Sequence, residues 1–156
     1  MMTGSIHAFL RDEGTDWRGR RLADVLAFDD SRIEAVHDFV QWLFPLPEPS
    51  RAVPGAPVLG PEEAAAIRAD PVALEGFRAG LERMARFYAG TDHWLTRADH
   101  NHLRISRIIA ATRDLLGREA AADFHARVTA RNEAAGWPVN ATSLRYWEQA
   151  LGTGEG

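Results

Sequence analysis

Residues 37–50 read His-Asp-Phe-Val-Gln-Trp-Leu-Phe-Pro-Leu-Pro-Glu-Pro-Ser, and this stretch decides the fold. Large apolar side chains fill its first half, and Pro45 ends it. Proline lacks a backbone N–H and its ring clashes with the preceding helical turn, so a helix that enters this stretch ends there. Ser31 and Glu34 form a capping-box pattern upstream, with two aspartates just before them as alternative caps. We therefore predict a helix from about residue 31 to residue 44.

The predicted helix is apolar over most of its circumference. Phe39 and Trp42 widen an apolar face and leave Gln41 in a narrow polar stripe. A helix with so wide an apolar face belongs in the centre of a core, and we expect Trp42 to be a core anchor. The face itself consists of Ile33, Val36, Val40, Leu43 and Phe44.

Helix start and stop signals recur along the chain, whereas the alternation typical of strands never persists. Residues 45–61 hold six of the eight prolines and predict a stiff, extended connector. The sequence therefore predicts an all-α fold: a single compact bundle of about six to seven helices with one long proline-rich loop, in one domain over residues 1–156. The further helices are expected over 22–28, 61–69, 71–89, 99–116, 118–135 and from 141 onward. Their signals are Pro61, Asp70, Asp99 and Asn140 at starts and Gly90, Gly117 and Gly136 at ends.

The composition argues against several classes of protein. A net charge of −4 disfavours a broad nucleic-acid interface, and the absence of cysteine excludes disulfides and cysteine-ligated zinc. No run of about 18 apolar residues occurs and no signal-peptide pattern opens the chain, so we expect a cytoplasmic protein without a transmembrane segment. All 18 basic residues are arginine, which excludes lysine chemistry and, with the many Ala and Gly residues, indicates a bacterial source.

The His37-Asp38 pair permits a metal-dependent interpretation. In all-helical HD-type phosphohydrolases an adjacent His and Asp hold a divalent metal together with a distant His and Asp, for which His7 and Asp99 are candidates here. The alternative is a hydrogen-bonded core histidine, because His37 lies between apolar positions of the predicted helix.

A polar cluster at Asp99, His100, Asn101 and His102 opens the helix predicted over 99–116. Free N–H groups at a helix start attract anions and carbonyl groups, so these four residues form a candidate ligand site. The same residues also suit plain capping and solvation of the helix start. Two histidines at i and i+2 lie on different helix faces and make a poor metal chelate.

A second candidate is the arginine group at Arg18, Arg20 and Arg21, which follows Trp17. Guanidinium groups bind carboxylates and phosphates through paired hydrogen bonds, so this group could clamp an anion. A solvated helix start balanced by neighbouring acidic residues is the alternative. We expect a ligand to lie where Arg18 and Arg21, the 99–102 cluster and the proline-rich loop meet.

The proline-rich loop also contains Pro54-Gly55-Ala56-Pro57, a PxxP pattern with Arg51 nearby. Such patterns in polyproline II conformation are ligands of SH3-type domains. The alternative is a rigid crossover that apolar side chains hold against the core.

Three blocks of the sequence are similar to one known family. The first is the string from Phe28 through Pro45, the second is Met-Ala-Arg-Phe-Tyr at 84–88, and the third is Asn-His-Leu-Arg-Ile-Ser-Arg-Ile at 101–108 with Leu-Leu-Gly at 115–117. Together they resemble the opioid growth factor receptor conserved region over about residues 9–150. The resemblance implies an all-helical domain with no established catalytic residues, whose eukaryotic members are described as receptors for an opioid peptide.

The functional prediction follows from this resemblance. We expect a non-enzymatic helical domain that binds a peptide or protein, with no cofactor and no metal. A metal-dependent HD-type phosphohydrolase using His37 and Asp38 is the alternative.

Overall fold

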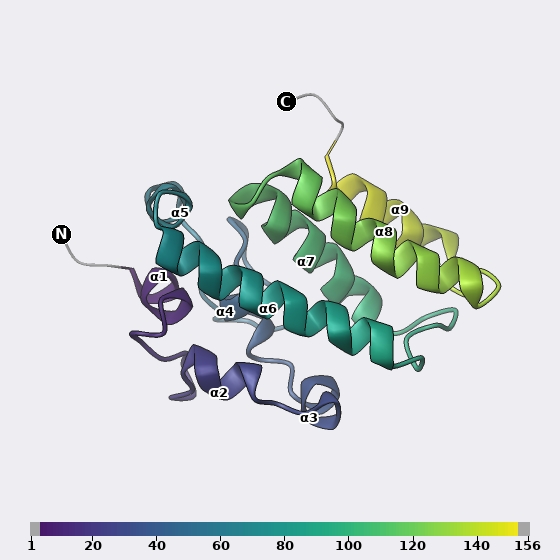
Figure 1. The fold of residues 1–156 in the computed structure, drawn as a ribbon, viewed down its shortest axis with the longest axis horizontal. Helices are drawn as coiled ribbons and strands as arrows, with labels where there is room; N and C mark the ends of the chain where they lie inside the picture. The colour runs from purple at the N-terminus through teal and green to yellow at the C-terminus, as the bar shows by residue number, and fades with distance from the viewer. Residues whose placement is uncertain (1–3, 153–156) are drawn as a thin grey trace. The chain divides into compact units, whose positions relative to one another are not determined.

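The computed structural model describes residues 4–152, which form nine helices and no strand (Figure 1). The all-α prediction is confirmed. The chain divides into two compact units, Met1–Arg83 (unit 1) and Met84–Gly156 (unit 2), and the boundary falls inside one helix, α6 (Pro71–Gly90). That residues 1–156 act as a single domain stays a prediction. None of the described helices is long and apolar enough to cross a membrane.

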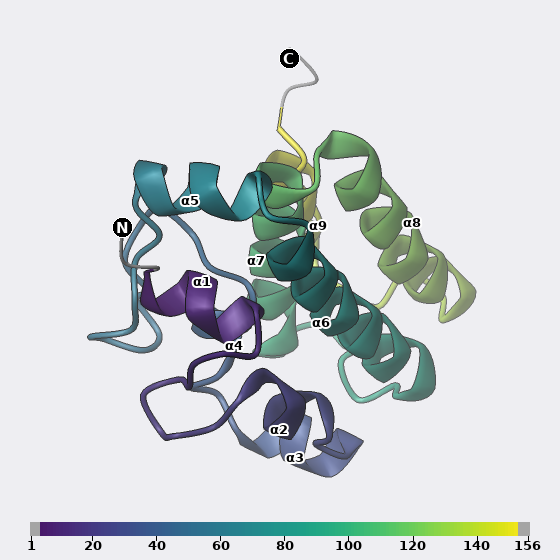
Figure 2. The same cartoon turned by 60° about the vertical axis from the view of Figure 1, so that its left-hand side comes forward.

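Unit 1 contains mostly short helices. They are α1 (Ser5–Leu10), α2 (Leu22–Leu26), α3 (Asp30–Ala35), α4 (Val40–Leu43), α5 (Pro61–Arg68) and the first part of α6. Helix α1, which has no counterpart among the predicted helices, packs against both α4 and α5 (Figure 2). The prediction of a core Trp42 is confirmed, because its side chain is buried and its ring meets Phe9 edge-on at 5.8 Å.

The prediction of one continuous helix from residue 31 to residue 44 is wrong, because the structure has two helices there. Helix α3 ends where Val36 becomes extended (φ −99°, ψ 127°), and α4 begins only at Val40. Tertiary contacts account for the break: Trp17 Nε1 donates to the Asp38 carbonyl oxygen at 2.9 Å, an oxygen that helix continuation would use. Because of the break, two predicted side-chain positions are wrong. Gln41, predicted on the polar face, is buried, and His37, predicted among core residues, is exposed.

Two glycines let α6 approach its neighbours in unit 1. A Cβ at Gly76 would collide with the carbonyl oxygen of Leu10, and one at Gly80 would meet the side chain of Leu43 at 2.5 Å. Glycine inside a helix costs about 0.5–1 kcal/mol relative to alanine. Here the close approach of α1 and α4 to α6 requires it.

The proline-rich connector is non-helical, as predicted, but it turns back on itself. Ala56 N donates to Val53 O at 3.2 Å, with a proline at the second position and Gly55 at φ +84°. These are the marks of a type II turn. Leu59 N also donates to Leu46 O at 2.8 Å. The PxxP interpretation is therefore wrong, because its centre forms a tight turn and not a polyproline II helix.

Unit 2 contains the longer helices α7 (Asn101–Leu115), α8 (Arg118–Ala134) and α9 (Ala141–Ala150), together with the last turns of α6. Helix α7 packs against both α8 and α9 (Figure 2). The helix starts and ends in unit 2 lie at or close to the predicted residues. Asn140 Oδ1 accepts from Ser143 N at 2.8 Å, and Gly117 and Gly136 have φ of 107° and 89°. Trp94 and Trp147 are fully buried, with their ring centres 6.5 Å apart.

Candidate binding groove

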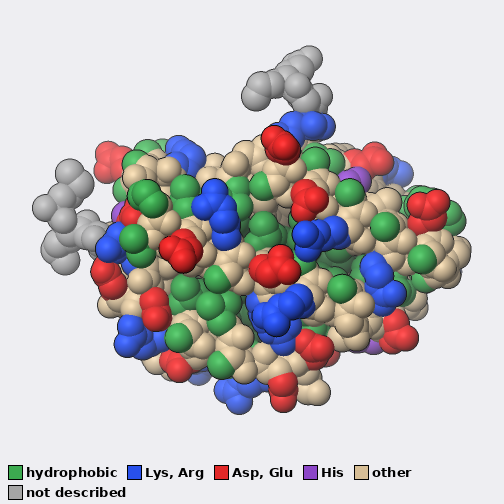
Figure 3. All heavy atoms as spheres, viewed as in Figure 1, with side chains coloured by type: hydrophobic (Ala, Val, Ile, Leu, Met, Phe, Trp, Pro, Cys, Tyr) green, Lys and Arg blue, Asp and Glu red, His purple; other side chains and the backbone are tan. Residues whose placement is uncertain are grey.

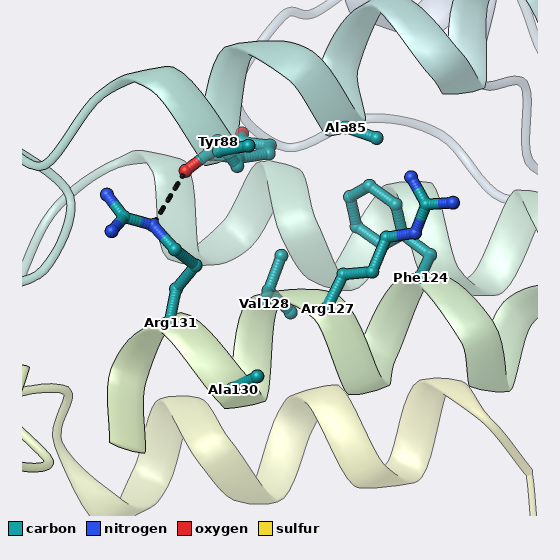
Figure 4. A pocket seen from close by; sticks show the side chains of 8 residues that line it. Ala85, Tyr88, Phe124, Arg127, Val128, Ala130 and Arg131 are labelled. Carbon is teal, nitrogen blue, oxygen red and sulfur yellow. Dashed lines mark hydrogen bonds between the residues drawn. The ribbon is translucent and has the colours of Figure 1, made fainter. Parts of the chain in front are cut away.

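A groove of about 310 Å³ lies in unit 2 between the last turns of α6 and helix α8 (Figure 4). Its floor is apolar and aromatic. Tyr88, Phe124 and Val128 are buried, and the Tyr88 and Phe124 rings meet edge-on at 6.3 Å. The lining consists of Ala85, Tyr88, Ala89, Phe124, Arg127, Val128, Ala130 and Arg131. Because three of these are alanines, the walls leave room that larger side chains would fill.

Two arginines on α8 stand at the two ends of the groove, with Val128 between them (Figure 4). Arg131 donates through Nη2 to Thr91 O at 2.7 Å and through Nε to Tyr88 O at 3.4 Å. These carbonyls belong to the C-terminal end of α6, where cations are favoured. Arg131 therefore ties α8 to α6 and closes one end of the groove.

Arg127 has a looser environment. Its Nε lies 3.3 Å from Asp123 Oδ2, one turn earlier on α8, and both side chains are mostly exposed. An exposed pair of this kind contributes only about 0–1 kcal/mol, so another carboxylate can replace Asp123 at small cost. The described lining of the groove contains no acidic side chain. The site is therefore an apolar slot with an arginine at each end, one of them paired with Asp123.

The sequence did not single out these residues, although a signal was present. Arg127 and Arg131 stand four residues apart, which places them on one face of a helix, and Phe124 and Val128 share the same spacing. What the sequence could not show is that Ala85 and Ala89 of another helix lie opposite this face.

The predicted cluster at the start of α7 forms an internal hydrogen-bond network. Asn101 is fully buried, and its Oδ1 accepts from Tyr88 Oη at 3.0 Å while its Nδ2 donates to Asp99 Oδ1 at 2.9 Å. The ring nitrogens of His93 and His100 lie 3.4 and 3.5 Å from the same Nδ2. Asp99 Oδ1 also accepts from Asn101 N at 2.9 Å. Asp99 thus caps the helix start, as the alternative interpretation had it.

His102 is buried and held from both sides. Its Nε2 lies 2.8 Å from Trp94 O and its Nδ1 lies 3.2 Å from Ser143 Oγ. Because a carbonyl only accepts, Nε2 donates to Trp94 O. The His102 carbonyl accepts in turn from Trp147 Nε1 at 2.9 Å. Of the four predicted residues, His100 is the one with an exposed side chain.

Arg18 and Arg21 lie in unit 1, where both contact acidic or carbonyl groups. Arg18 Nε donates to Asp38 Oδ2 at 2.9 Å, and Arg21 Nη2 donates to Asp12 O. Since the 99–102 cluster belongs to unit 2, its meeting with these arginines stays a prediction.

The strongest charge pairing in this part of unit 1 involves Arg20. Arg20 Nη2 donates to Asp38 Oδ1 at 2.8 Å and its Nε donates to the buried Asp16 at 2.7 Å. Burial alone would raise the pKa of the Asp38 carboxyl, but hydrogen bonds from Arg20 and Arg18 outweigh it and leave that pKa below its ordinary value. Both Asp38 oxygens are therefore engaged by arginine.

The residues predicted to hold a metal in the hydrolase alternative contact different partners. His7 Nε2 lies 2.7 Å from Asp70 Oδ2, and Asp38 contacts the two arginines just described, while His37 is exposed. Among residues 4–152, no group of three or more histidines or carboxylates is arranged to hold a metal ion.

The described residues are thus all helical and carry a groove on the surface of unit 2. Residues 21–94 match the family described as the opioid growth factor receptor (OGFr) conserved region, and this match confirms the resemblance predicted from the sequence. The match covers the first two blocks of the resemblance, while the block at 101–117 lies outside it. No curated protein and no solved structure is significantly similar to this chain.

Proposed function

We propose that the chain is a non-enzymatic helical domain that binds a peptide or protein segment in the groove between α6 and α8. The observation that carries this proposal is the groove itself, an apolar slot over Tyr88, Phe124 and Val128 with an arginine at each end. Binding sites typically combine an apolar floor with a few polar groups that orient the ligand. The family supports a binding role through the resemblance described above, and the lack of cysteine fits a cytoplasmic location.

Selection from a phage-displayed random peptide library tests this function. The wild-type chain serves as bait, and the variant Ala89→Trp serves for counter-selection, because an indole at this exposed position fills the groove. We expect enrichment of peptides that bind the wild type and not the variant. Thermal melts of both proteins control for folding. If both proteins retain all enriched peptides equally, the groove is not the binding site and the proposal is wrong.

The predicted site at Asp99, His100, Asn101 and His102 with Arg18 and Arg21 can be tested with the same peptides. Histidine ring resonances are followed while a selected peptide is titrated. A response of His100 together with a response at Arg18 and Arg21 side chains would support that site. Responses confined to residues 85–89 and 124–131 would assign binding to the groove alone.

A further inference from the structure

We infer that the groove selects an acidic protein segment, in which one aliphatic side chain enters the slot and flanking carboxylates pair with Arg127 and Arg131. This inference rests on the proposed function and deepens it by naming the chemistry of the partner. It is carried by the size of the groove and by the charges at its two ends.

The size of the groove limits what enters it. A volume of about 310 Å³ is at the lower end of the range of about 300–1,000 Å³ for small-ligand sites. The slot over Phe124 and Val128 is thus large enough to take an aliphatic side chain. Affinity beyond that single anchor has to come from groups at the ends.

The ends of the groove supply charge. Arg127 and Arg131 are separated by one turn of α8, or about 6 Å along the helix axis. Arg131 already donates through Nε and Nη2 to α6 carbonyls, which fixes the guanidinium plane and leaves its Nη1 group with two further N–H donors. A guanidinium held in place in this way loses little side-chain entropy when it binds a carboxylate.

Charge complementarity points to an acidic partner. The chain as a whole carries −4, yet the described lining of the groove has two arginines and no carboxylate. In the space-filling view, arginine side chains stand beside hydrophobic and acidic side chains on the face that displays α6 and α8 (Figure 3). A local cationic site on an acidic protein attracts carboxylates and repels basic segments.

Three fluorescein-labelled synthetic peptides test the inference by fluorescence anisotropy. The first has a central leucine flanked by glutamates, the second has lysine in place of every glutamate, and the third has serine in place of leucine. We expect the first peptide to bind at least about tenfold more tightly than either of the others, and to weaken as salt is raised. Equal binding of the glutamate and lysine peptides would overturn the inference.

Variants of the chain test whether the glutamate peptide binds in the groove. Arg127→Ala should weaken the glutamate peptide about 3- to 10-fold, because one charge-assisted hydrogen bond is lost. Arg145→Ala, which removes an exposed arginine from α9, is the matched control and should leave binding unchanged. If Arg145→Ala weakens binding as much as Arg127→Ala, the affinity depends on the net charge of the chain and not on the groove, and the inference is wrong.

The two proposals fail in different ways. Library peptides that bind the wild type, are rejected by Ala89→Trp and lack acidic residues would keep the proposed function and refute the acidic partner. No groove-dependent binding by any library peptide or by the glutamate peptide would refute both.

Discussion

Units 1 and 2 are both helical, but different interactions hold their helices in place. In unit 1, helices α1 to α4 have four to six residues each, too short for stable helix formation in isolation. Arginine–aspartate contacts around Asp16 and Asp38 and the close approaches at Gly76 and Gly80 fix them. In unit 2, α7 and α8 have 15 and 17 residues and pack against each other.

This difference shows how the conserved region is built. The family match over residues 21–94 falls mostly in unit 1, where the helices depend on contacts between distant parts of the chain. The groove, by contrast, takes five of its eight lining residues from α8, which lies outside the match. The family match therefore includes only three of the eight residues that line the groove.

The largest effects are expected from removing a buried tryptophan from each unit. Trp42→Ala and Trp147→Ala should each cost about 3–5 kcal/mol of unfolding free energy, because each leaves a large cavity. Urea denaturation measures the loss, and hydrogen exchange shows where protection falls. If residues 1–156 are one domain, either substitution lowers protection throughout. Loss confined to residues 4–83 in Trp42→Ala would instead show that the units unfold independently.

A smaller effect is expected at the close approach of α6 to α1. Gly76→Ala should cost about 1–3 kcal/mol, since its Cβ would meet the rigid carbonyl of Leu10. Gly80→Ala is the comparison: its Cβ would meet the buried Leu43 side chain at 2.5 Å, so it should also destabilise, but by less than Gly76→Ala because a side chain shifts more readily than a helix backbone. Equal costs for the two variants, measured by urea denaturation, would contradict the role of the backbone contact.

Helix caps offer a comparison between the units. Asp29 Oδ1 accepts from Arg32 N at 2.8 Å in unit 1, and Asn140 caps α9 in unit 2. Alanine at a cap costs about 0.5–2 kcal/mol. We expect the cost of Asn140→Ala to lie near the upper end of this range, because Asn140 Nδ2 also donates to Arg97 O. The cost of Asp29→Ala should lie near the lower end. Thermal melts that rank the two in the opposite order would show that α3 depends on its cap more than α9 does.

The last effect concerns Asp70; its contribution is greatest at neutral pH and disappears in acid. Hydrogen bonds from Arg11 and His7 hold the pKa of the Asp70 carboxyl well below its usual range. Because the folded pKa is lower than the unfolded one, this stabilisation is complete above about pH 4 and is lost as pH falls toward the lowered pKa.

The variant Asp70→Asn tests this while it keeps the cap of α6, in which Oδ1 accepts from Val72 N at 3.0 Å. Denaturant midpoints measured between roughly pH 5 and pH 2 should fall less steeply in the variant than in the wild type. Identical slopes would mean that other carboxylates control the acid transition.

The sequence alone determined the helical class and most helix ends, because these depend on residues within one turn of each other. Asp70 and Asn140 cap the helices that follow them, Pro61 opens α5, and Gly117, with a positive φ, separates α7 from α8. The family was likewise readable from the string that ends at Pro45.

Only the tertiary structure decided the features that join distant residues. The helix expected from 31 to 44 breaks because Trp17 and Arg20 bind Asp38 from some twenty residues away. Local sequence patterns contain no record of such contacts, so they placed Gln41 on the polar side and His37 in the core. The groove likewise depends on distant residues. Phe124 and Val128 of α8 form a slot only because alanines of α6 lie opposite them.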